Sequence, residues 1–244
     1  MPLTGNNEET ADYLRTFDLK IVQPKTGYRF SLDPLLLCDF APATIGSILD
    51  LGTGCGIIPL VMARRSPAAA IAAVELQPRL AEIAARNIAD NGLTGRVTLL
   101  AADILELADH YPANSFDLVM GNPPYRQAGT GKTSPRSGRD LARHESSATL
   151  ADFLLVAKKM VKSSGSICYI YHPERLAELL SRALELRLSP ARLQMVHGNA
   201  SLPARMFLIE LFKGRRVSLE VLPPLLVQDS MYGAHQHAGT KKAP

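Results

Sequence analysis

The segment Asn122-Pro123-Pro124-Tyr125 contains groups that could hold a planar amine. It follows an apolar run, residues 116–120, which is short enough to be a buried strand. Two consecutive prolines predict a stiff turn, because proline fixes φ and pushes the preceding residue towards extended geometry. The Asn122 side-chain oxygen and the Pro123 carbonyl could then accept both N–H bonds of an –NH2 group, with Tyr125 stacked on the ring that carries the amine. The alternative is a proline-rich loop with a capping Asn and a packed Tyr.

A second candidate site is the glycine-rich segment at residues 50–56, Asp-Leu-Gly-Thr-Gly-Cys-Gly. Its glycines permit a tight turn and let a ligand approach the backbone closely. The G-x-G-x-x-G spacing of dinucleotide-binding domains is not met, because Ile57 occupies the sixth position. The next predicted strand ends in Glu75, whose carboxylate could accept both hydroxyls of a ribose and would repel a 2′-phosphate. Taken alone, Glu75 is equally compatible with an exposed carboxylate at a strand end.

Strand and helix patterns alternate around these two segments, which predicts an α/β fold. The predicted strands are 47–51, 70–75, 96–101, 116–120 and 166–171, and the predicted helices are 57–65, 78–91, 104–109, 149–162 and 173–187. Two further β-like runs, 191–196 and 205–212, have no helical segment between them. The sequence therefore predicts a parallel sheet with helices on both faces, closed by a C-terminal antiparallel hairpin.

The order of these motifs resembles that of the amino-methylating methyltransferases that depend on S-adenosylmethionine, whose motif is Asp/Asn/Ser-Pro-Pro-Tyr/Phe/Trp. Four further segments, residues 28–33, 142–145, 213–214 and 222–225, are similar to one subgroup. That subgroup is the bacterial tRNA (adenine-N6)-methyltransferases, which act on the adenine beside the anticodon of a valine tRNA. The resemblance implies a Rossmann-like, seven-stranded methyltransferase sheet, S-adenosyl-L-methionine as the cofactor and tRNA as the substrate partner.

The resemblance also implies which residues contact each ligand. Asp50 would orient the glycine-rich segment or meet the methionine amine of the cofactor. Glu75 would take the ribose hydroxyls, and Asp103 would accept from the cofactor's adenine amine. Arg29 and Ser31 would fold over the cofactor. The expected cofactor-binding residues are Asp50, Gly52, Gly54, Gly56, Glu75, Asp103, Asn122, Arg29 and Ser31, and the expected catalytic residues are Asn122, Pro123 and Tyr125.

Residues 126–145 form a Gly/Ser/Thr-rich stretch with five basic and two acidic side chains. A basic loop directly after an amine-binding turn suits a polyanionic substrate. The expected RNA-binding residues are Lys132, Arg136, Arg139 and Arg143. The alternative is a solvated surface loop. Two roles are possible for His144 and Glu145. They could lie near the target nucleotide, or they could form a pair at the start of a helix that steadies the loop.

Composition narrows the class of protein. With 244 residues, 46% of them hydrophobic, the chain can bury one core with a small appendage, and its net charge of +4 is mild. No apolar run reaches the roughly 20 residues of a membrane helix, and the first residues lack a signal-peptide pattern. Cys38, Cys55 and Cys168 lie far apart without metal-ligand spacing. We therefore expect reduced thiols, no metal, no membrane, no obligate protein partner and a cytoplasmic location.

The expected domains are an N-terminal extension at residues 1–45 that caps the cofactor site, a class I methyltransferase domain at 46–226 and a flexible tail at 227–244. Within the extension, residues 1–10 are expected to lack regular structure and residues 19–23 to form a strand. A helix is expected to begin near Pro34.

Three other functions stay open at this point. A protein glutamine-N5 methyltransferase uses the same Asn-Pro-Pro-Tyr geometry on a carboxamide, although no helical substrate domain is evident before the first sheet strand. An rRNA guanine-N2 methyltransferase more often carries Phe at the last motif position. A noncatalytic RNA-binding module on the same fold would have no need of an intact Asn122, Glu75 and glycine-rich segment.

Overall fold

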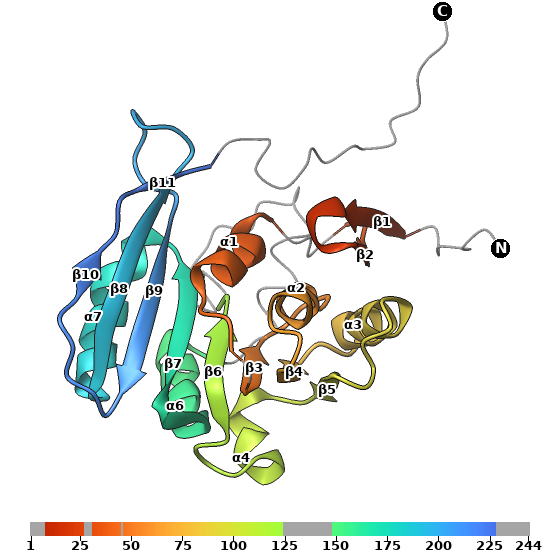
Figure 1. Cartoon of the computed structure of the whole chain (residues 1–244), viewed down its shortest axis with the longest axis horizontal. Coiled ribbons are helices and arrows are strands. Elements are labelled where there is room, and N and C mark those ends of the chain that lie inside the picture. Colours follow the sequence, from red (N-terminus) through yellow and green to blue (C-terminus); the bar gives the residue numbers. More distant parts are fainter. Residues whose placement is uncertain (1–7, 27–30, 45, 124–147, 228–244) are drawn as a thin grey trace, which may run out of the picture.

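The computed structural model describes residues 8–26, 31–44, 46–123 and 148–227. Its centre is a sheet with the strand order β10-β8-β9-β7-β6-β3-β4-β5 (Figure 1), and β11 lies beside β8. The longer strands are β3 (Ser47–Leu51), β4 (Ala70–Glu75), β5 (Val97–Ala101), β6 (Phe116–Gly121), β7 (Val161–Tyr171), β8 (Leu188–His197) and β9 (Met206–Lys213). Strands β3 to β7 are parallel, and β9 is antiparallel to both of its neighbours. The predicted Rossmann-like sheet with its C-terminal antiparallel hairpin is therefore confirmed.

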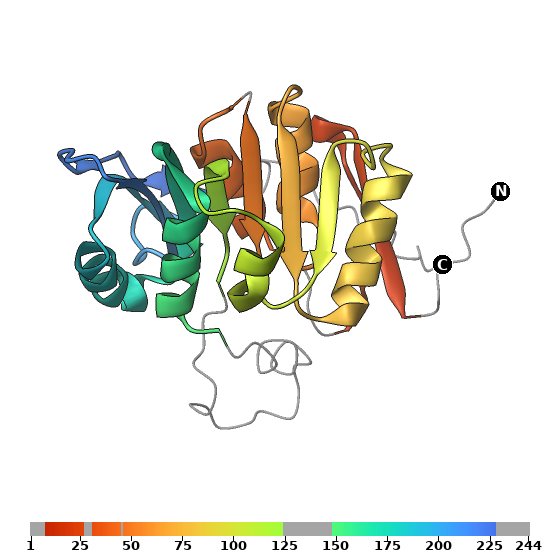
Figure 2. The same cartoon turned by 90° about the horizontal axis from the view of Figure 1, so that it is seen from below.

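Helices cover both faces of the sheet, as Figures 1 and 2 show from two directions. The helices are α1 (Asp33–Phe40), α2 (Ile57–Arg65), α3 (Pro78–Asp90), α4 (Leu107–His110), α6 (Leu150–Met160) and α7 (Leu176–Glu185). Side chains of a strand alternate between the two faces. Accordingly, Ile48 of β3 packs in the apolar cluster that includes α1, α2 and α3, whereas Leu49 packs in the cluster that includes α4, α6 and α7.

An antiparallel hairpin of β1 (Glu9–Leu14) and β2 (Leu19–Pro24) forms a separate two-stranded sheet beside α2 and α3 (Figure 1). Leu19 and Ile21 are fully buried in the cluster of α1, α2 and α3, and the strand expected at residues 19–23 is confirmed. The expectation that residues 1–10 lack regular structure is wrong for Glu9 and Thr10, which lie in β1. Three of the six residues of β1 are polar and only Leu14 is buried, so its pattern gave little sign of a strand.

The largest shift in an element boundary is at β7. A helix was expected to continue to residue 162, but α6 ends at Met160 and the strand begins at Val161. Gly165, which lies between the expected helix at 149–162 and the expected strand at 166–171, is inside β7, where a Cβ atom would come within 2.5 Å of the Asp117 carbonyl oxygen. The pairing of β6 with β7 also shifts register between Phe116 and Leu118. The glycine thus permits a close passage of the two strands instead of ending an element.

Two short strands extend the edge of the sheet beyond β8. β10 (Glu220–Val221) and β11 (Leu225–Leu226) both run parallel to β8. Backbone bonds from Leu222 N–H to the Leu193 carbonyl and from Val227 N–H to the His197 carbonyl, each 2.8 Å, fasten this segment. In the parts of the chain that the structure describes, no helix has both the length and the apolar character required to cross a bilayer.

Candidate functional site

The carboxyl ends of the parallel strands bring the two sequence motifs to one edge of the sheet. Leu51, the last residue of β3, is paired with Val74 on one side and with Gly121 on the other. Glu75 at the end of β4 is paired with Ala101 at the end of β5. The strand order reverses at β3, because β4 and β5 continue on one side and β6 and β7 on the other. Open α/β sheets bind their ligands at such a point of reversal.

The glycine loop, residues 52–56, connects β3 to α2 at this edge. Gly52, Gly54 and Gly56 have φ angles of 73°, 60° and 90°. These left-handed conformations cost little only for glycine, so the tight turn predicted from the sequence is confirmed. The N–H groups of Gly52 and Thr53 both donate to the Val74 carbonyl, at 3.0 and 2.8 Å, and bend the loop over the end of β4.

Glu75 is almost completely buried against the glycine loop, with 5% of its surface exposed. Its Oε2 accepts from the Gly54 N–H at 2.8 Å, and its Oε1 accepts from the Gln77 N–H at 2.9 Å. Burial raises the pKa of Glu75, while the N–H groups of Gln77, Gly54 and Leu76 oppose the rise. Glu75 therefore has a structural role that sequence reasoning missed. Each carboxylate oxygen has a second lone pair for a ligand hydroxyl.

Asp50 is a fully buried carboxylate one residue before the end of β3. Among the described residues, neither of its oxygens has a hydrogen-bond partner, and the Thr53 hydroxyl also has none. Burial raises the pKa of Asp50 to about 7, and the nearby Glu75 carboxylate adds to the rise. A buried carboxylate without a partner is costly to the fold. Its position next to the glycine loop fits a cationic ligand group such as an α-ammonium.

Asp103 and Ser31 each make a local structural contact. Asp103 Oδ1 accepts from the Leu105 N–H at 3.0 Å and caps the short 3-10 helix Ile104–Glu106. Ser31 is exposed, and its hydroxyl accepts from the Asp33 N–H at 3.3 Å at the start of α1. The structure thus places Asp103 after the end of β5 and Ser31 before α1. Their contacts with a cofactor stay predictions.

The Asn-Pro-Pro-Tyr segment, which was expected to bind an amine, begins where β6 ends. Asn122 is half-buried and Pro123 is buried directly after Gly121. At Gly121 a Cβ atom would meet a ring carbon of Tyr169 at 2.9 Å and the Leu51 carbonyl at 3.4 Å. The absence of a side chain at Gly121 therefore lets the chain leave β6 in close contact with β3 and β7.

Several predicted site residues, and the two residues whose role stayed open, lie outside the described residues. They are Arg29, Tyr125, Lys132, Arg136, Arg139, Arg143, His144 and Glu145.

One polar residue at the glycine loop was not singled out from the sequence. Asn87 of α3 is completely buried, and its Nδ2 donates to the Cys55 carbonyl at 2.8 Å. In the sequence it is an ordinary polar residue of an amphipathic helix, which gives no sign that its side chain reaches another segment. Only the packing of α3 against the loop reveals the contact.

Comparison with known proteins assigns this arrangement to a family. Residues 33–185 match the methyltransferase small domain family. The chain belongs to this family. The matched stretch begins at α1, includes the glycine loop, Glu75 and the Asn-Pro-Pro-Tyr segment, and ends with α7. The resemblance to methyltransferases that the motifs indicated is therefore confirmed.

Relatives named tRNA1(Val) (adenine(37)-N6)-methyltransferase are similar to a large part of the chain. The protein of Porphyromonas gingivalis is 33% identical over 150 residues, which cover 61% of this chain and 58% of that protein. The protein of Shewanella loihica is 33% identical over 187 residues, which cover 75% of this chain and 76% of that protein. The chain thus spans a little over half the length of the first of these relatives and about three quarters of the second.

A solved structure has the same architecture. The crystal structure of a predicted O-methyltransferase from Agrobacterium tumefaciens superposes with a TM-score of 0.64 at 25% identity. The superposition covers 80% of this chain and 86% of that chain. The methyltransferase fold that the resemblance implied is therefore found in an independent structure.

Proposed function

We propose that this methyltransferase small domain protein transfers a methyl group from S-adenosylmethionine to the N6 amine of an adenine in tRNA, at the position beside the anticodon of a valine tRNA. The observation that carries the proposal is the meeting of two sites at one edge of the sheet. The glycine loop with Asp50 and Glu75 follows β3 and β4, and Asn122 with Pro123 follows β6. The names of the relatives support tRNA adenine as the substrate.

The residues of the glycine loop and its surroundings fit the cofactor. The carboxylate of Asp50 has no hydrogen-bond partner in the described part of the chain and would meet the α-ammonium of the methionine moiety. Glu75 would accept the ribose hydroxyls through its remaining lone pairs. Asp103, just after the end of β5, would accept from the adenine amine. S-adenosylmethionine, when bound, supplies an electrophilic methyl group on a sulfonium centre.

The turn after β6 would act on the amine of the target base. The exocyclic nitrogen of adenine is a weak nucleophile, because its lone pair is delocalised into the ring. The Asn122 side-chain oxygen and the Pro123 carbonyl would accept both N–H bonds of the amine. This favours a pyramidal nitrogen and directs its lone pair towards the methyl donor. Rate acceleration then comes from position and charge placement, without a strong base. After the transfer the amine is a stronger acid and releases its proton to water.

The basic stretch after the turn would bind the RNA. A base in an anticodon loop must be splayed out before an enzyme can reach its amine, and an aromatic ring can stack on it. Tyr125 would supply that ring. Lys132, Arg136, Arg139 and Arg143 would contact phosphates around it. This part of the proposal rests on the sequence and on the names of the relatives.

Transfer of a tritiated methyl group into tRNA from a strain that lacks the gene tests the proposal. Digestion of the labelled tRNA to nucleosides should yield N6-methyladenosine. Label in protein would overturn the proposal in favour of glutamine-N5 methylation, and label in rRNA guanine would overturn it in favour of guanine-N2 methylation. Absence of transfer together with retained tRNA binding would indicate a noncatalytic RNA-binding protein.

Glu75→Ala is expected to weaken S-adenosylmethionine binding by about 1.5–3 kcal/mol, since a charged acceptor of two hydroxyls is lost. Calorimetry measures the change. Because Glu75 also holds the Gly54 N–H, binding of S-adenosylhomocysteine should be compared with binding of its 2′-deoxy form. The wild type should prefer the form with both hydroxyls, and the variant should lose this preference. A preference that survives in full would leave Glu75 as a support of the loop only.

Neutralising Arg136 and Arg139 with glutamine is expected to weaken tRNA binding and to flatten the log–log salt dependence by up to about two units, because each phosphate contact releases about one counterion. The matched control neutralises Arg215 and Arg216, which follow β9 at the amino ends of the parallel strands, away from the glycine loop. The control should keep the salt slope, and both pairs should keep cofactor affinity. If the two pairs gave equal slopes of the salt dependence, the interpretation of residues 126–145 as a solvated surface loop would be favoured.

A further inference from the structure

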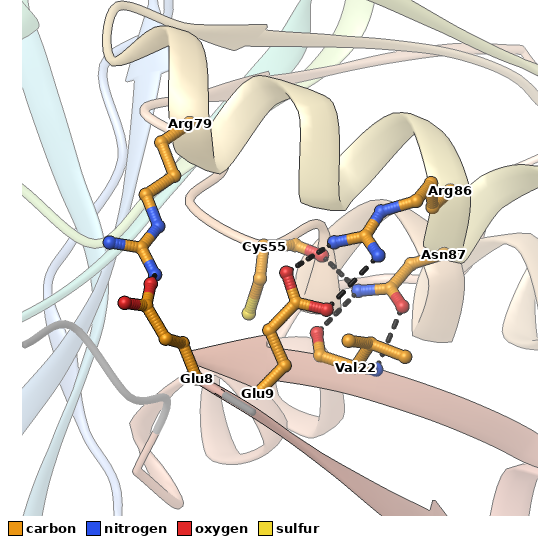
Figure 3. A network of polar contacts seen from close by, with 7 residues as sticks. All are labelled: Glu8, Glu9, Val22, Cys55, Arg79, Arg86 and Asn87. Carbon is orange, nitrogen blue, oxygen red and sulfur yellow. Dashed lines mark hydrogen bonds and ion pairs between the residues drawn. The ribbon is translucent and has the colours of Figure 1, made fainter. Parts of the chain in front are cut away.

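The amide of Asn87 joins two backbone segments that are far apart in the sequence. Its Oδ1 accepts from the Val22 N–H at 2.8 Å, and its Nδ2 donates to the Val22 carbonyl at 2.8 Å. The same Nδ2 donates its other hydrogen to the Cys55 carbonyl at 2.8 Å. Figure 3 shows the side chain of Asn87 between β2 and the glycine loop. One buried side chain thus connects the β1–β2 hairpin to the loop.

The hairpin lies along α3 and has three more side-chain contacts with the helix and its C-terminal end. Asn91 repeats the pairing of Asn87 one turn later: Oδ1 accepts from the Lys20 N–H at 2.9 Å and Nδ2 donates to the Lys20 carbonyl at 2.7 Å. Its second amide hydrogen goes to the Asn87 carbonyl at 2.7 Å. The ion pairs Arg79–Glu8 and Arg86–Glu9, at 2.8 and 2.6 Å, hold the start of the hairpin (Figure 3).

The glycine loop depends on restraints from outside. Glycines at positive φ are permissive in conformation, so they do not fix the directions of the peptide groups around Cys55. The Gly54 N–H is held by Glu75 on one side of the loop, and the Cys55 carbonyl is held by Asn87 on the other. The contact at Cys55 orients the peptide group that Cys55 shares with Gly56. A restraint of this kind pre-organises a site and so lowers the cost of binding.

We propose that Asn87 is a positioning residue that couples docking of the β1–β2 hairpin to the geometry of the glycine loop, so that a docked hairpin tightens S-adenosylmethionine binding. The proposal rests on the proposed function, since it takes the glycine loop as the cofactor site. Asn87 itself has no place among the groups that contact the cofactor. Its effect reaches the cofactor through the Cys55 carbonyl.

Asn87→Ala and Asn91→Ala form a matched pair for the test. Each removes two bonds to β2 and one further bond, which goes to Cys55 in one case and to Asn87 in the other. Asn87 is fully buried within α3, whereas Asn91 is half-buried at the end of the helix, so the loss of stability is expected to be larger for Asn87→Ala. Both variants should lose thermal stability. Only Asn87→Ala should weaken S-adenosylmethionine binding, by roughly five- to tenfold, which is the size expected for one net hydrogen bond.

The kinetic parameters separate this role from a general loss of structure. Asn87→Ala should raise the KM for S-adenosylmethionine by the same factor, with kcat at saturating cofactor and the KM for tRNA close to those of the wild type. Equal cofactor affinities for the two variants would overturn the proposal. A wild-type protein that binds no S-adenosylmethionine would instead overturn the proposed function.

A measurement on the wild type applies even where Asn87→Ala fails to fold. Coupling between two sites is reciprocal, so a cofactor that prefers the restrained loop must also stabilise hairpin docking. Exchange of the Val22 amide hydrogen, which is bonded to Asn87, should slow several-fold on addition of S-adenosylhomocysteine. The reference is the amide of Ile209 in β9, a strand paired on both sides, which is expected to exchange through global opening. A Val22 rate that changes no more than the reference rate would overturn the proposal.

Discussion

Replacement of Asn122 with alanine is expected to lower kcat by roughly 10²–10³-fold, or about 2.7–4 kcal/mol. Asn122 is proposed to hold the target amine in the geometry of the transition state, so its loss acts on the chemical step. Affinities for cofactor and tRNA should change much less, because the glycine loop, Glu75 and the basic stretch remain. Single-turnover methyl transfer with saturating cofactor and tRNA measures the effect.

Three further variants serve as controls for the turn. Asn122→Asp keeps an acceptor oxygen and should retain more activity than the alanine variant. Tyr125→Phe keeps the stacking ring and should stay active. Tyr125→Ala should cost both base affinity and rate, since stacking is worth about 1–3 kcal/mol per base. Near-normal turnover by Asn122→Ala would mean that Asn-Pro-Pro-Tyr is a structural turn here.

Asp50→Asn is expected to stabilise the protein without its ligand and to weaken its cofactor binding. Burial raises the pKa of Asp50 from 3.8 to about 7. The folded state therefore holds the proton more tightly than the unfolded state, and the free energy of unfolding falls as pH rises from about 4 to about 7. At about 1.4 kcal/mol per pKa unit this shift corresponds to roughly 4.5 kcal/mol at pH 8. Asparagine removes the charge but keeps a buried polar group, so the variant should gain part of that amount, roughly 2–4 kcal/mol.

The same substitution should weaken S-adenosylmethionine binding by roughly 1.5–3 kcal/mol, because an ionic hydrogen bond to the α-ammonium is lost. The cofactor needs the ionised carboxylate, so wild-type binding near pH 6 should release protons and should tighten as pH rises towards 7. Calorimetry in buffers of different ionisation enthalpy measures the proton release, and urea unfolding measures stability. The variant should release none. If the Asp50→Asn protein released as many protons as the wild type, the protons would come from a group other than Asp50.

Asp117→Asn is the matched control for charge. The Asp117 carboxylate lies at the amino ends of the parallel strands, away from the glycine loop. There it accepts from Lys162 Nζ and from the Ser47 N–H, each at 2.8 Å. These contacts, with the Lys162 bond as the largest cause, lower the pKa of Asp117. Its ionised form therefore supports the fold above the unfolded pKa, and the variant should be less stable at pH 8. Its cofactor affinity should match that of the wild type.

The strand order and the place of the site could be predicted because they depend on local signals. Apolar runs marked the strands, glycines marked the loop, and the carboxyl ends of parallel strands share an edge. What could not be predicted are contacts between segments. The bond from Gly54 to Glu75 and the bonds of Asn87 require a three-dimensional neighbourhood that no spacing encodes. Asn91 was interpreted as a helix end, whereas its side chain also binds β2.

The lateral edge of the sheet at β8, β10 and β11 affects whether another chain could add a strand to it. An uncovered β8 would present a row of unpaired N–H and C=O groups, which is a template for a strand of another chain. Here β10 and β11, two residues each, cover part of that row, and Pro223 and Pro224 lie between them. Proline has no N–H to donate, and strands this short offer little to pair with. Growth of the sheet by addition of a neighbouring molecule is therefore blocked along this segment by the chain itself.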